Sequence, residues 1–403
     1  MSKETSAANE SLRRVLLLPT LLLCTFLAFT VAWFFSTLLV DVASTFKVSI
    51  GTASQLAMVG TAAGVIMGFA LSVISIRFKH KSLFLLGIAF YAAGTLSYFF
   101  AANFATAVLS QFLVGLGAAM IMAMAYTLIG EQLPLERRGW ATGLVISSVM
   151  ASAVIVATLS GFIASVAGWR SVLLLFIFPL SIFCFALGSV VIPSKQPQLQ
   201  SATKPSYKQA FKKIFLNRSP IACVVSTLLV AFIGVVPVYA VSFYRIVFSV
   251  SPTVGGVFSS IAAAGGMVGG AVGGRLVNRY GRKSIAVTTV FISGICCILF
   301  TFIPVIGLSV AVWFIAASTV GMTWAGLPSL TMEQVPDFRA SMMSINNSFD
   351  NAGTILGVII GGLILNLFSN FHLLMLILGA LGASAAAVLL FGAKDPCKVV
   401  STQ

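Results

Sequence analysis

Acidic residues are scarce in this chain, and of the nine Asp350 has the most unusual surroundings. It lies in an apolar segment, and amide or hydroxyl side chains stand near it at helical spacing: Asn346, Asn347, Asn351 and Thr354. A carboxylate away from water favours its protonated form unless a partner stabilises the charge. The pattern therefore predicts a site that binds a proton or pairs with a cationic group. The alternative is a structural carboxylate that is hydrogen-bonded to its asparagines.

The composition indicates which kind of fold must position such a side chain. Only 8% of the residues are charged and 59% are apolar, whereas a soluble domain has about 25% charged residues. So few charges cannot cover a water-soluble surface, which excludes an ordinary cytosolic enzyme and a nucleic-acid-binding domain despite the net charge of +15. The two histidines are far apart and the six cysteines have no paired spacing. We therefore expect no metal site, no cofactor and no disulfide framework.

Apolar runs separated by glycine, proline or charge clusters predict an all-α membrane protein with twelve transmembrane helices. A helix that spans lipid needs about 20 mostly apolar residues. The predicted helices cover residues 15–40, 52–76, 83–101, 105–130, 140–166, 170–192, 220–247, 253–277, 284–304, 307–330, 342–368 and 370–393. Asp350 then lies about 13 Å along the eleventh helix, near the middle of a hydrocarbon core about 30 Å thick.

The basic residues predict the orientation of these helices. If both termini lie in the cytoplasm, 21 of the 24 lysines and arginines fall on the cytoplasmic side. Only Lys47, Arg170 and Arg245 fall outside or near the outer face. This distribution agrees with the positive-inside rule, and it explains the net charge without a nucleic-acid partner.

The sequence contains an internal repeat with an offset of 202 residues. Glu131-Gln132-Leu133-Pro134 aligns with Glu333-Gln334-Val335-Pro336, and Arg77, Lys81 and Arg137 align with Arg279, Lys283 and Arg339. Residues 1–192 and 220–403 are therefore predicted as two six-helix bundles, joined by a basic cytoplasmic linker at 193–219. Within the linker, Tyr207, Phe211, Ile214 and Phe215 predict a helix on the membrane surface, and a solvated linker is the alternative. Parallel repeats of this kind are typical of transporters that bind solute at the repeat interface.

The segment between the eighth and ninth helices reads Gly274-Arg275-Leu276-Val277-Asn278-Arg279-Tyr280-Gly281-Arg282-Lys283. It resembles the loop signature of the major facilitator superfamily, Gly-x-Leu-x-Asp-Arg-x-Gly-Arg-Lys, with Asn278 where the acidic residue usually stands. The resemblance implies two pseudo-symmetric six-helix bundles and extends over essentially the whole chain. Two features of the family's proton-coupled drug antiporters are missing, because Gln111 replaces their arginine and the fifth helix lacks their Gly-Pro motif. The resemblance therefore indicates the superfamily and not that subclass.

Charged residues at the helix ends are candidates for gates. Glu131 and Glu333 end the fourth and tenth helices, six residues before Arg137 and Arg339, and Arg77, Lys81, Arg279 and Arg282 are available as partners. We expect inner ion pairs that break and reform, and static pairs within each half are the alternative. At the outer ends of the first and seventh helices, Asp41 and Arg245 are predicted to form an ion pair that closes an outer gate. The alternative there is two unrelated charges that anchor in lipid headgroups.

Polar and aromatic residues on the first, fourth, seventh and tenth helices are candidates for solute contact. They are Trp33, Gln111, Tyr126, Tyr239 and Trp324, with Met120, Met124 and Ser226. Such groups suit a moderately apolar solute that has a few hydrogen-bonding atoms. The alternative for each of them is ordinary helix packing.

These features together predict a secondary transporter that moves a small organic solute by alternating access. We expect proton coupling, with the solute's own gradient as the alternative driving force. The transport is expected to be efflux of drug-like compounds or metabolites, and the alternative is uptake of an organic solute, anionic if Arg245 faces the cavity. No P-loop and no catalytic motif of a membrane enzyme occurs in the sequence, so we expect neither ATP hydrolysis nor enzymatic activity. A sensor that binds solute without moving it is the third hypothesis. The expected location is the plasma membrane, as a monomer in the lipid bilayer.

The outer ion pair gives a direct test. Reversing the charge of either Asp41 or Arg245 alone should reduce transport, because two like charges then face each other. Reversing both should restore transport, since the attraction is re-formed with the partners exchanged. Solute flux into vesicles measures the rescue, and a double variant as inactive as the single variants would contradict the pair.

Overall fold

The computed structural model of the chain describes all residues except 1, 76, 194–213, 337–338 and 396–403. The described residues contain no strand, and twelve helices are long and apolar enough to cross a membrane. The prediction of an all-α membrane protein with twelve transmembrane helices is therefore confirmed. Most of the predicted surface helix in the linker lies outside the described residues, as do the side chains of Asn278 and Arg339.

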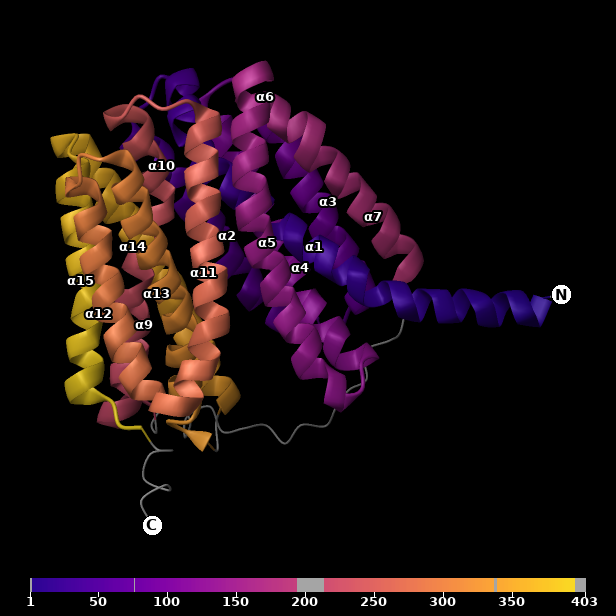
Figure 1. The fold of residues 1–403 in the computed structure, drawn as a ribbon. Helices are drawn as coiled ribbons and strands as arrows, with labels where there is room; N and C mark the ends of the chain where they lie inside the picture. The colour runs from indigo at the N-terminus through magenta and orange to yellow at the C-terminus, as the bar shows by residue number, and fades with distance from the viewer. Residues whose placement is uncertain (1, 76, 194–213, 337–338, 396–403) are drawn as a thin grey trace, which may run out of the picture. The chain divides into compact units, whose positions relative to one another are not determined.

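The helix bounds follow the predicted segments within a few residues (Figure 1). The first six spans are α1 (Ser2–Phe46), α2 (Ile50–Ile74), α3 (His80–Phe99), α4 (Phe104–Gln132), α5 (Leu135–Ala167), and α6 (Trp169–Val172) continued by η1 (Leu173–Ile177) and α7 (Phe178–Val191). The second six are α9 (Arg218–Gly234) with α10 (Val236–Val247), α11 (Pro252–Tyr280), α12 (Arg282–Phe302), α13 (Ile306–Met332), α14 (Arg339–Phe368) and α15 (Phe371–Gly392).

The largest differences from the predicted spans are in the first helix, which begins at Ser2 instead of residue 15 and continues past a kink at Leu38 to Phe46 instead of residue 40. In the turn after Asp41, the hydroxyls of Ser44 and Thr45 donate hydrogen bonds to the main-chain oxygen of Asp41 at 2.9 and 2.8 Å. The helix ends before Lys47, whose φ of 53° is not helical.

Two spans are interrupted near a proline. The π-helical turn Leu173–Ile177 lies just before Pro179, and the seventh span breaks at Val235, two residues before Pro237. Proline has no N–H to donate and its ring crowds the preceding turn. The interruptions are therefore local consequences of the sequence.

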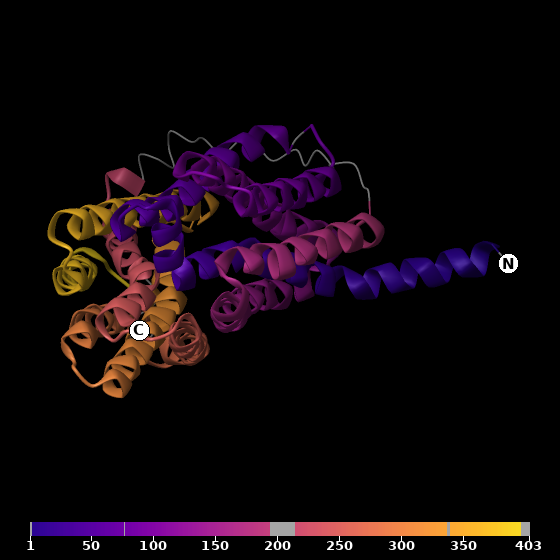
Figure 2. The ribbon, with the colours of Figure 1, turned by 90° about the horizontal axis from the view of Figure 1, so that it is seen from above.

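The chain forms two compact units. Unit 1 comprises Met1–Phe46, Val59–Gln200 and Ser251–Gly256, and unit 2 comprises Lys47–Met58, Ser201–Val250 and Val257–Gln403. In unit 1, α3 packs on α4 and on α7, and α1 packs on α5 and on α7. In unit 2 the equivalent pairs are α12 with α13 and α15, and α9 with α14 and α15. The helices of unit 2 run roughly vertically in Figure 1, and Figure 2 shows them from above.

The repeat extends to the turns. Lys47 after the first span and Ser249 after the seventh are separated by the 202-residue offset, and they have φ values of 53° and 52°. Positive φ is uncommon for residues other than glycine. The same unusual turn at both positions indicates that the two halves share backbone geometry and not only a hydrophobic pattern.

Glycines set the distance between helices within each unit. A Cβ atom on Gly60 would lie 2.9 Å from the Gln111 side chain, and one on Gly115 would overlap the Gly60 carbonyl, so α2 and α4 approach closely in unit 1. In unit 2, a Cβ on Gly269 would overlap the carbonyl of Ser318, and one on Gly273 would lie 2.7 Å from the Cα of Met322. Small residues allow such approach between helices in lipid.

Two glycine variants of α11 test this packing. Gly269→Ala should lower the stability by about 1–3 kcal/mol, because the added methyl group overlaps the backbone of α13. Gly274→Ala is the matched control, since nothing lies within 4 Å of a Cβ at that position. The apparent melting temperature in detergent measures both effects. Equal melting temperatures for Gly269→Ala and the unmodified protein would contradict the close contact.

Candidate functional site

The polar residues of α14 are divided between two environments. The side chain of Asn346 is 3% exposed, and its Oδ1 accepts a hydrogen bond of 2.7 Å from the hydroxyl of Thr227 on α9. Asp350 and Asn347 are exposed, and Asn351 is half-buried with its Nδ2 donating to the main-chain oxygen of Asn347 at 3.0 Å. Asn346 therefore holds α14 to α9, while Asp350, Asn347 and Asn351 form an open polar face.

Glycines fix the rotation of α14 about its axis. A Cβ on Gly353 would overlap the carbonyl of Leu228, and one on Gly357 would lie 3.0 Å from the side chain of Val235. Asp350 precedes Gly353 by three residues and follows Asn346 by four, so it stands at the border of the face that packs on α9. Because larger residues would not fit at these glycines, α14 cannot turn to bury Asp350 against α9.

The same face of α14 is covered further along the helix. Asn347, Asn351, Thr354, Val358 and Gly362 follow one another at spacings of three or four residues, so they share one side of the helix. At Val358 and Gly362 this side packs against residues 51–55 of α2, which belong to unit 2. The polar face is therefore open near Asp350 and covered by α2 near the C-terminal end of α14.

The contact between α2 and α14 is made largely by backbone atoms. A Cβ on Gly51 would overlap the carbonyl of Gly362, and Gln55 Nε2 donates to the carbonyl of Val358 at 3.4 Å. The hydroxyl of Tyr239 donates to the same carbonyl at 2.9 Å and lies 3.0 Å from the hydroxyl of Ser54. Next to this contact, Ser49 and Thr52 are both hydrogen-bonded to Asn366.

Unit 1 contains the equivalent contact, between the start of α11 and the end of α5. The hydroxyl of Thr253 donates to the carbonyl of Gly161 at 3.2 Å and to the hydroxyl of Ser165 at 3.0 Å. A Cβ on Gly256 would overlap the carbonyl of Ala157. Thr253 is related to Gly51 by the 202-residue offset, so the two contacts are repeats of one another. Each joins residues from the first half of the sequence to residues from the second.

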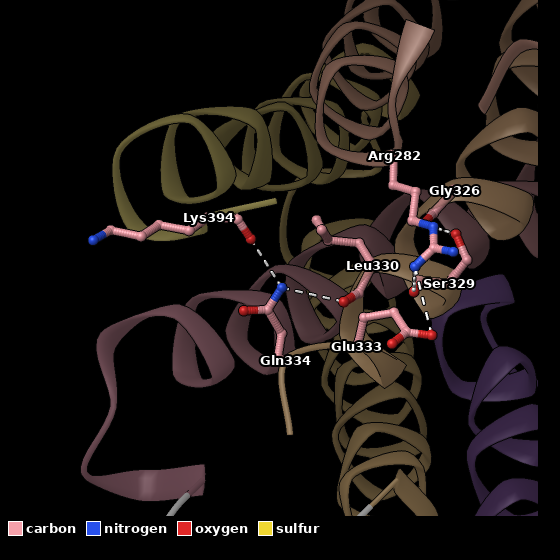
Figure 3. Close-up of polar contacts among 7 residues, drawn as sticks. All are labelled: Arg282, Gly326, Ser329, Leu330, Glu333, Gln334 and Lys394. Atoms are coloured by element: carbon pink, nitrogen blue, oxygen red, sulfur yellow. Dashed lines mark hydrogen bonds and ion pairs between the residues drawn. The ribbon is translucent and has the colours of Figure 1, made fainter. Parts of the chain in front are cut away.

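At the other end of unit 2, one ion pair links α12 to the end of α13 (Figure 3). Arg282 Nη1 lies 3.6 Å from Glu333 Oε1 and 3.4 Å from the carbonyl oxygen of Ser329. The next residue, Gln334, donates through Nε2 to the carbonyls of Leu330 and Lys394 at 3.2 and 3.0 Å. This cluster holds the ends of α12, α13 and α15 together.

In unit 1 the equivalent position is occupied by a histidine. His80 Nδ1 lies 2.7 Å from Glu131 Oε1, and its Nε2 lies 3.2 Å from the carbonyl oxygen of Ser75. His80 and Glu131 are related to Arg282 and Glu333 by the repeat offset. The predicted partners of Glu131 were arginines and a lysine and did not include His80, although the repeat offset relates His80 to Arg282. The His80–Glu131 pair lies within unit 1, and the Arg282–Glu333 pair lies within unit 2.

The other basic residues of these loops have separate environments. Lys81 Nζ donates to the carbonyl of Ser189 at 2.6 Å, and Lys283 Nζ to the carbonyl of Leu390 at 2.8 Å. The guanidinium of Arg279 lies 5.3 Å from the centre of the Tyr280 ring. Arg77 and Arg137 are exposed. In the signature segment, Gly281 is the N-cap residue immediately before α12. Its φ of 91° is a conformation that favours glycine.

Asp41 and Arg245 lie in different units and are each half-buried. Asp41 is on α1 and Arg245 is on α10, near the end of each span. The ion pair between them stays a prediction.

The residues predicted to contact solute are also in different environments. Tyr126 on α4 and Trp324 on α13 are 40% and 50% exposed. Gln111 is 6% exposed and its Oε1 is buried without a hydrogen-bond partner, as is Nε1 of the half-buried Trp33. Tyr239 is buried, with its hydroxyl bonded to Val358 and Ser54 as described above. Among the described residues, no group of three or more His, Cys, Asp or Glu side chains could hold a metal ion.

Comparison with known proteins gives the family. The family model of the Major Facilitator Superfamily matches residues 21–341 and 244–403. One curated relative, the uncharacterized MFS-type transporter YcnB of Bacillus subtilis (strain 168), is 28% identical over 116 residues, which are 29% of this chain. The match spans 24% of the length of that relative.

Solved structures share the fold at low sequence identity. A bacterial homologue of the human lysosomal transporter Spinster, in an inward-facing and unoccupied conformation, has a TM-score of 0.73 at 18% identity, with 95% of this chain and 99% of that chain covered. A variant of the nucleoside transporter NupG has a TM-score of 0.76 at 16% identity, covering 94% and 100%. A D-xylose–proton symporter has a TM-score of 0.76 at 16% identity, covering 95% and 98%. The chain belongs to the Major Facilitator Superfamily of membrane transporters.

Proposed function

We propose that this protein is a secondary transporter that moves a small organic solute by alternating access and couples the movement to protons. The observation that carries the proposal is the face of α14, which is polar and open at Asp350 and closed by α2 at Gly362. An exposed carboxylate in the middle of a membrane-spanning helix is costly in lipid, and such residues usually serve ion or substrate pathways. The proposed location is the plasma membrane, with both termini in the cytoplasm.

Asp350 is the proposed proton-binding residue. Asn347 and Asn351 are three residues before and one residue after it on the same helix, and their amides can donate hydrogen bonds to a solute. Protonation removes the charge and lowers the cost of covering this face with another helix or with solute. Binding and release of a proton at Asp350 would thereby couple to opening and closing of the pathway.

The two glycine contacts form the proposed gate, at the N-terminal ends of α2 and α11 and the C-terminal ends of α14 and α5. Backbone atoms of α2 and α14 meet at Gly51 and Gly362, and those of α11 and α5 meet at Thr253 and Gly161. Opening the gate would separate this close packing and break the few hydrogen bonds beside it, which include those of Gln55 to Val358 and of Thr253 to Gly161. The pairs His80–Glu131 and Arg282–Glu333 each join helices of one unit, which favours the alternative that they hold each half rigid.

The solute class follows from the side chains available and from the relatives. Tyr126, Trp324, Gln111 and Trp33 offer aromatic surface and a few hydrogen-bonding atoms, which suits an organic solute of moderate polarity. The similar structures include a nucleoside transporter and a D-xylose–proton symporter. Solutes of these classes are therefore the first to test.

The role of Asp350 predicts a specific transport defect. In vesicles with an imposed pH gradient, the unmodified protein should accumulate one member of a labelled panel of pentoses, nucleosides and lipophilic cations. Asp350→Asn should abolish this accumulation but retain exchange of labelled for unlabelled solute, because the amide cannot carry the proton. Asp350→Glu is the matched variant that keeps a titratable group and should retain part of the accumulation. Full accumulation by Asp350→Asn would contradict the proposal.

The proposed gate predicts a change in accessibility. Gly362→Val should open the contact between α2 and α14, because the side chain overlaps the backbone of Gly51 at a cost of about 1–3 kcal/mol. A cysteine at Asn351 should then react about 5- to 100-fold faster with an impermeant maleimide added from outside the cell. Leu363→Val is the control, because Leu363 is exposed beside the contact. Equal labelling rates in both variants would contradict the gate.

A further inference from the structure

A groove lies on unit 2 between the start of α9 and the end of α15. It has a volume of about 360 Å³ and is lined by the apolar side chains of Ile221, Val225, Val388 and Phe391. Ala222 and Gly392 form its floor, and among the described residues Arg218 is the only charged one that lines it. It lies at the end of the unit where Gln334 and Lys394 are hydrogen-bonded, and the residues that line it belong to α9 and α15 and not to α14.

Small residues create the groove. A Cβ on Gly392 would lie 2.6 Å from the Cβ of Ala222, so the two helices touch at the floor with no side chain large enough to fill the space above. Behind the floor, Cys223 and Leu389 are fully buried in the core of the unit. Ser219 Oγ accepts a hydrogen bond of 2.8 Å from the main-chain N–H of Lys394, which fixes the two helix ends to each other. The groove is therefore preformed.

The order of side chains along α9 matches the order of groups in a phospholipid. Arg218, Ile221 and Val225 stand at i, i+3 and i+7, so they share one side of the helix. The charged residue is at the helix end, and the apolar residues extend about 10 Å into the span. Phe391, which is 74% exposed, lines the groove from α15.

The charge of the groove favours an anionic headgroup. The exposed guanidinium of Arg218 can donate two parallel hydrogen bonds to a phosphate. In the part of the chain that the structure describes, no acidic residue lines the groove. The loops at this end are the basic ones, and the leaflet that faces such loops is the one that carries anionic lipids.

We propose that this groove binds an anionic phospholipid, with one acyl chain between Val225 and Phe391 and the phosphate on Arg218. The lipid would fill the space between α9 and α15 that their small residues leave open. This site is separate from the proposed solute pathway, so a failure of either proposal leaves the other intact.

Native mass spectrometry of the full-length protein tests the proposal. The detergent-purified protein is incubated with equal amounts of phosphatidylglycerol and phosphatidylcholine that have the same acyl chains. We expect phosphatidylglycerol adducts to exceed phosphatidylcholine adducts about fivefold to tenfold, since only one headgroup carries a net negative charge. Arg218→Gln should reduce this ratio to about one. Val225→Phe should reduce adducts of both lipids, because the ring occupies the acyl-chain site.

Lys47→Gln is the charge-matched control, because it removes one exposed cation that lies outside the groove. It should leave the lipid ratio unchanged. An unchanged ratio in Arg218→Gln would overturn the proposal, as would an equal loss in Lys47→Gln, which would indicate a general charge effect. Unchanged adduct levels in Val225→Phe, in protein that melts at the normal temperature, would also overturn it.

Discussion

Helices in lipid are not driven together by the hydrophobic effect, because lipid tails are as apolar as the helix surface. Close approach at glycine is the interaction on which the rest of this structure depends. It packs α2 on α4 and α11 on α13 within the units, and it fixes the rotation of α14 against α9. It also provides the two repeated contacts at Gly51 and Gly161. Where side chains are absent, the backbones meet at short distances, and at the two repeated contacts hydrogen bonds such as Gln55 to Val358 and Thr253 to Gly161 add to this packing.

The polar face of α14 depends on that packing. Gly353 and Gly357 hold one side of the helix against α9, and Asn346 adds a buried hydrogen bond to Thr227. Asp350 is then left at the border of the packed side, exposed beside its neighbouring amides. Further along the helix the same face is closed by α2. One helix thus carries both the titratable group and the contact proposed to open, which gives protonation a short physical route to the gate.

The internal repeat is preserved in backbone geometry more than in side-chain chemistry. The positive φ values of Lys47 and Ser249 and the repeated helix pairs show that the two halves have one architecture. At the loop ends, the same position holds His80 in one half and Arg282 in the other, each beside a glutamate. A weak ion pair at a helix end adds little to stability, so its chemistry can diverge while the packing stays fixed.

The sequence by itself determined the solvent, the twelve spans and the family, because these depend on hydropathy, charge distribution and a local signature that no tertiary contact can alter. It also singled out Asp350 and the two glutamates, since ionisable residues are rare in such a chain. Only the tertiary structure separated Asn346 from its neighbouring amides, gave Glu131 a histidine partner and showed that Tyr239 bonds to Val358. Helical periodicity assigns a residue to a face, but what covers that face depends on contacts between helices far apart in the sequence.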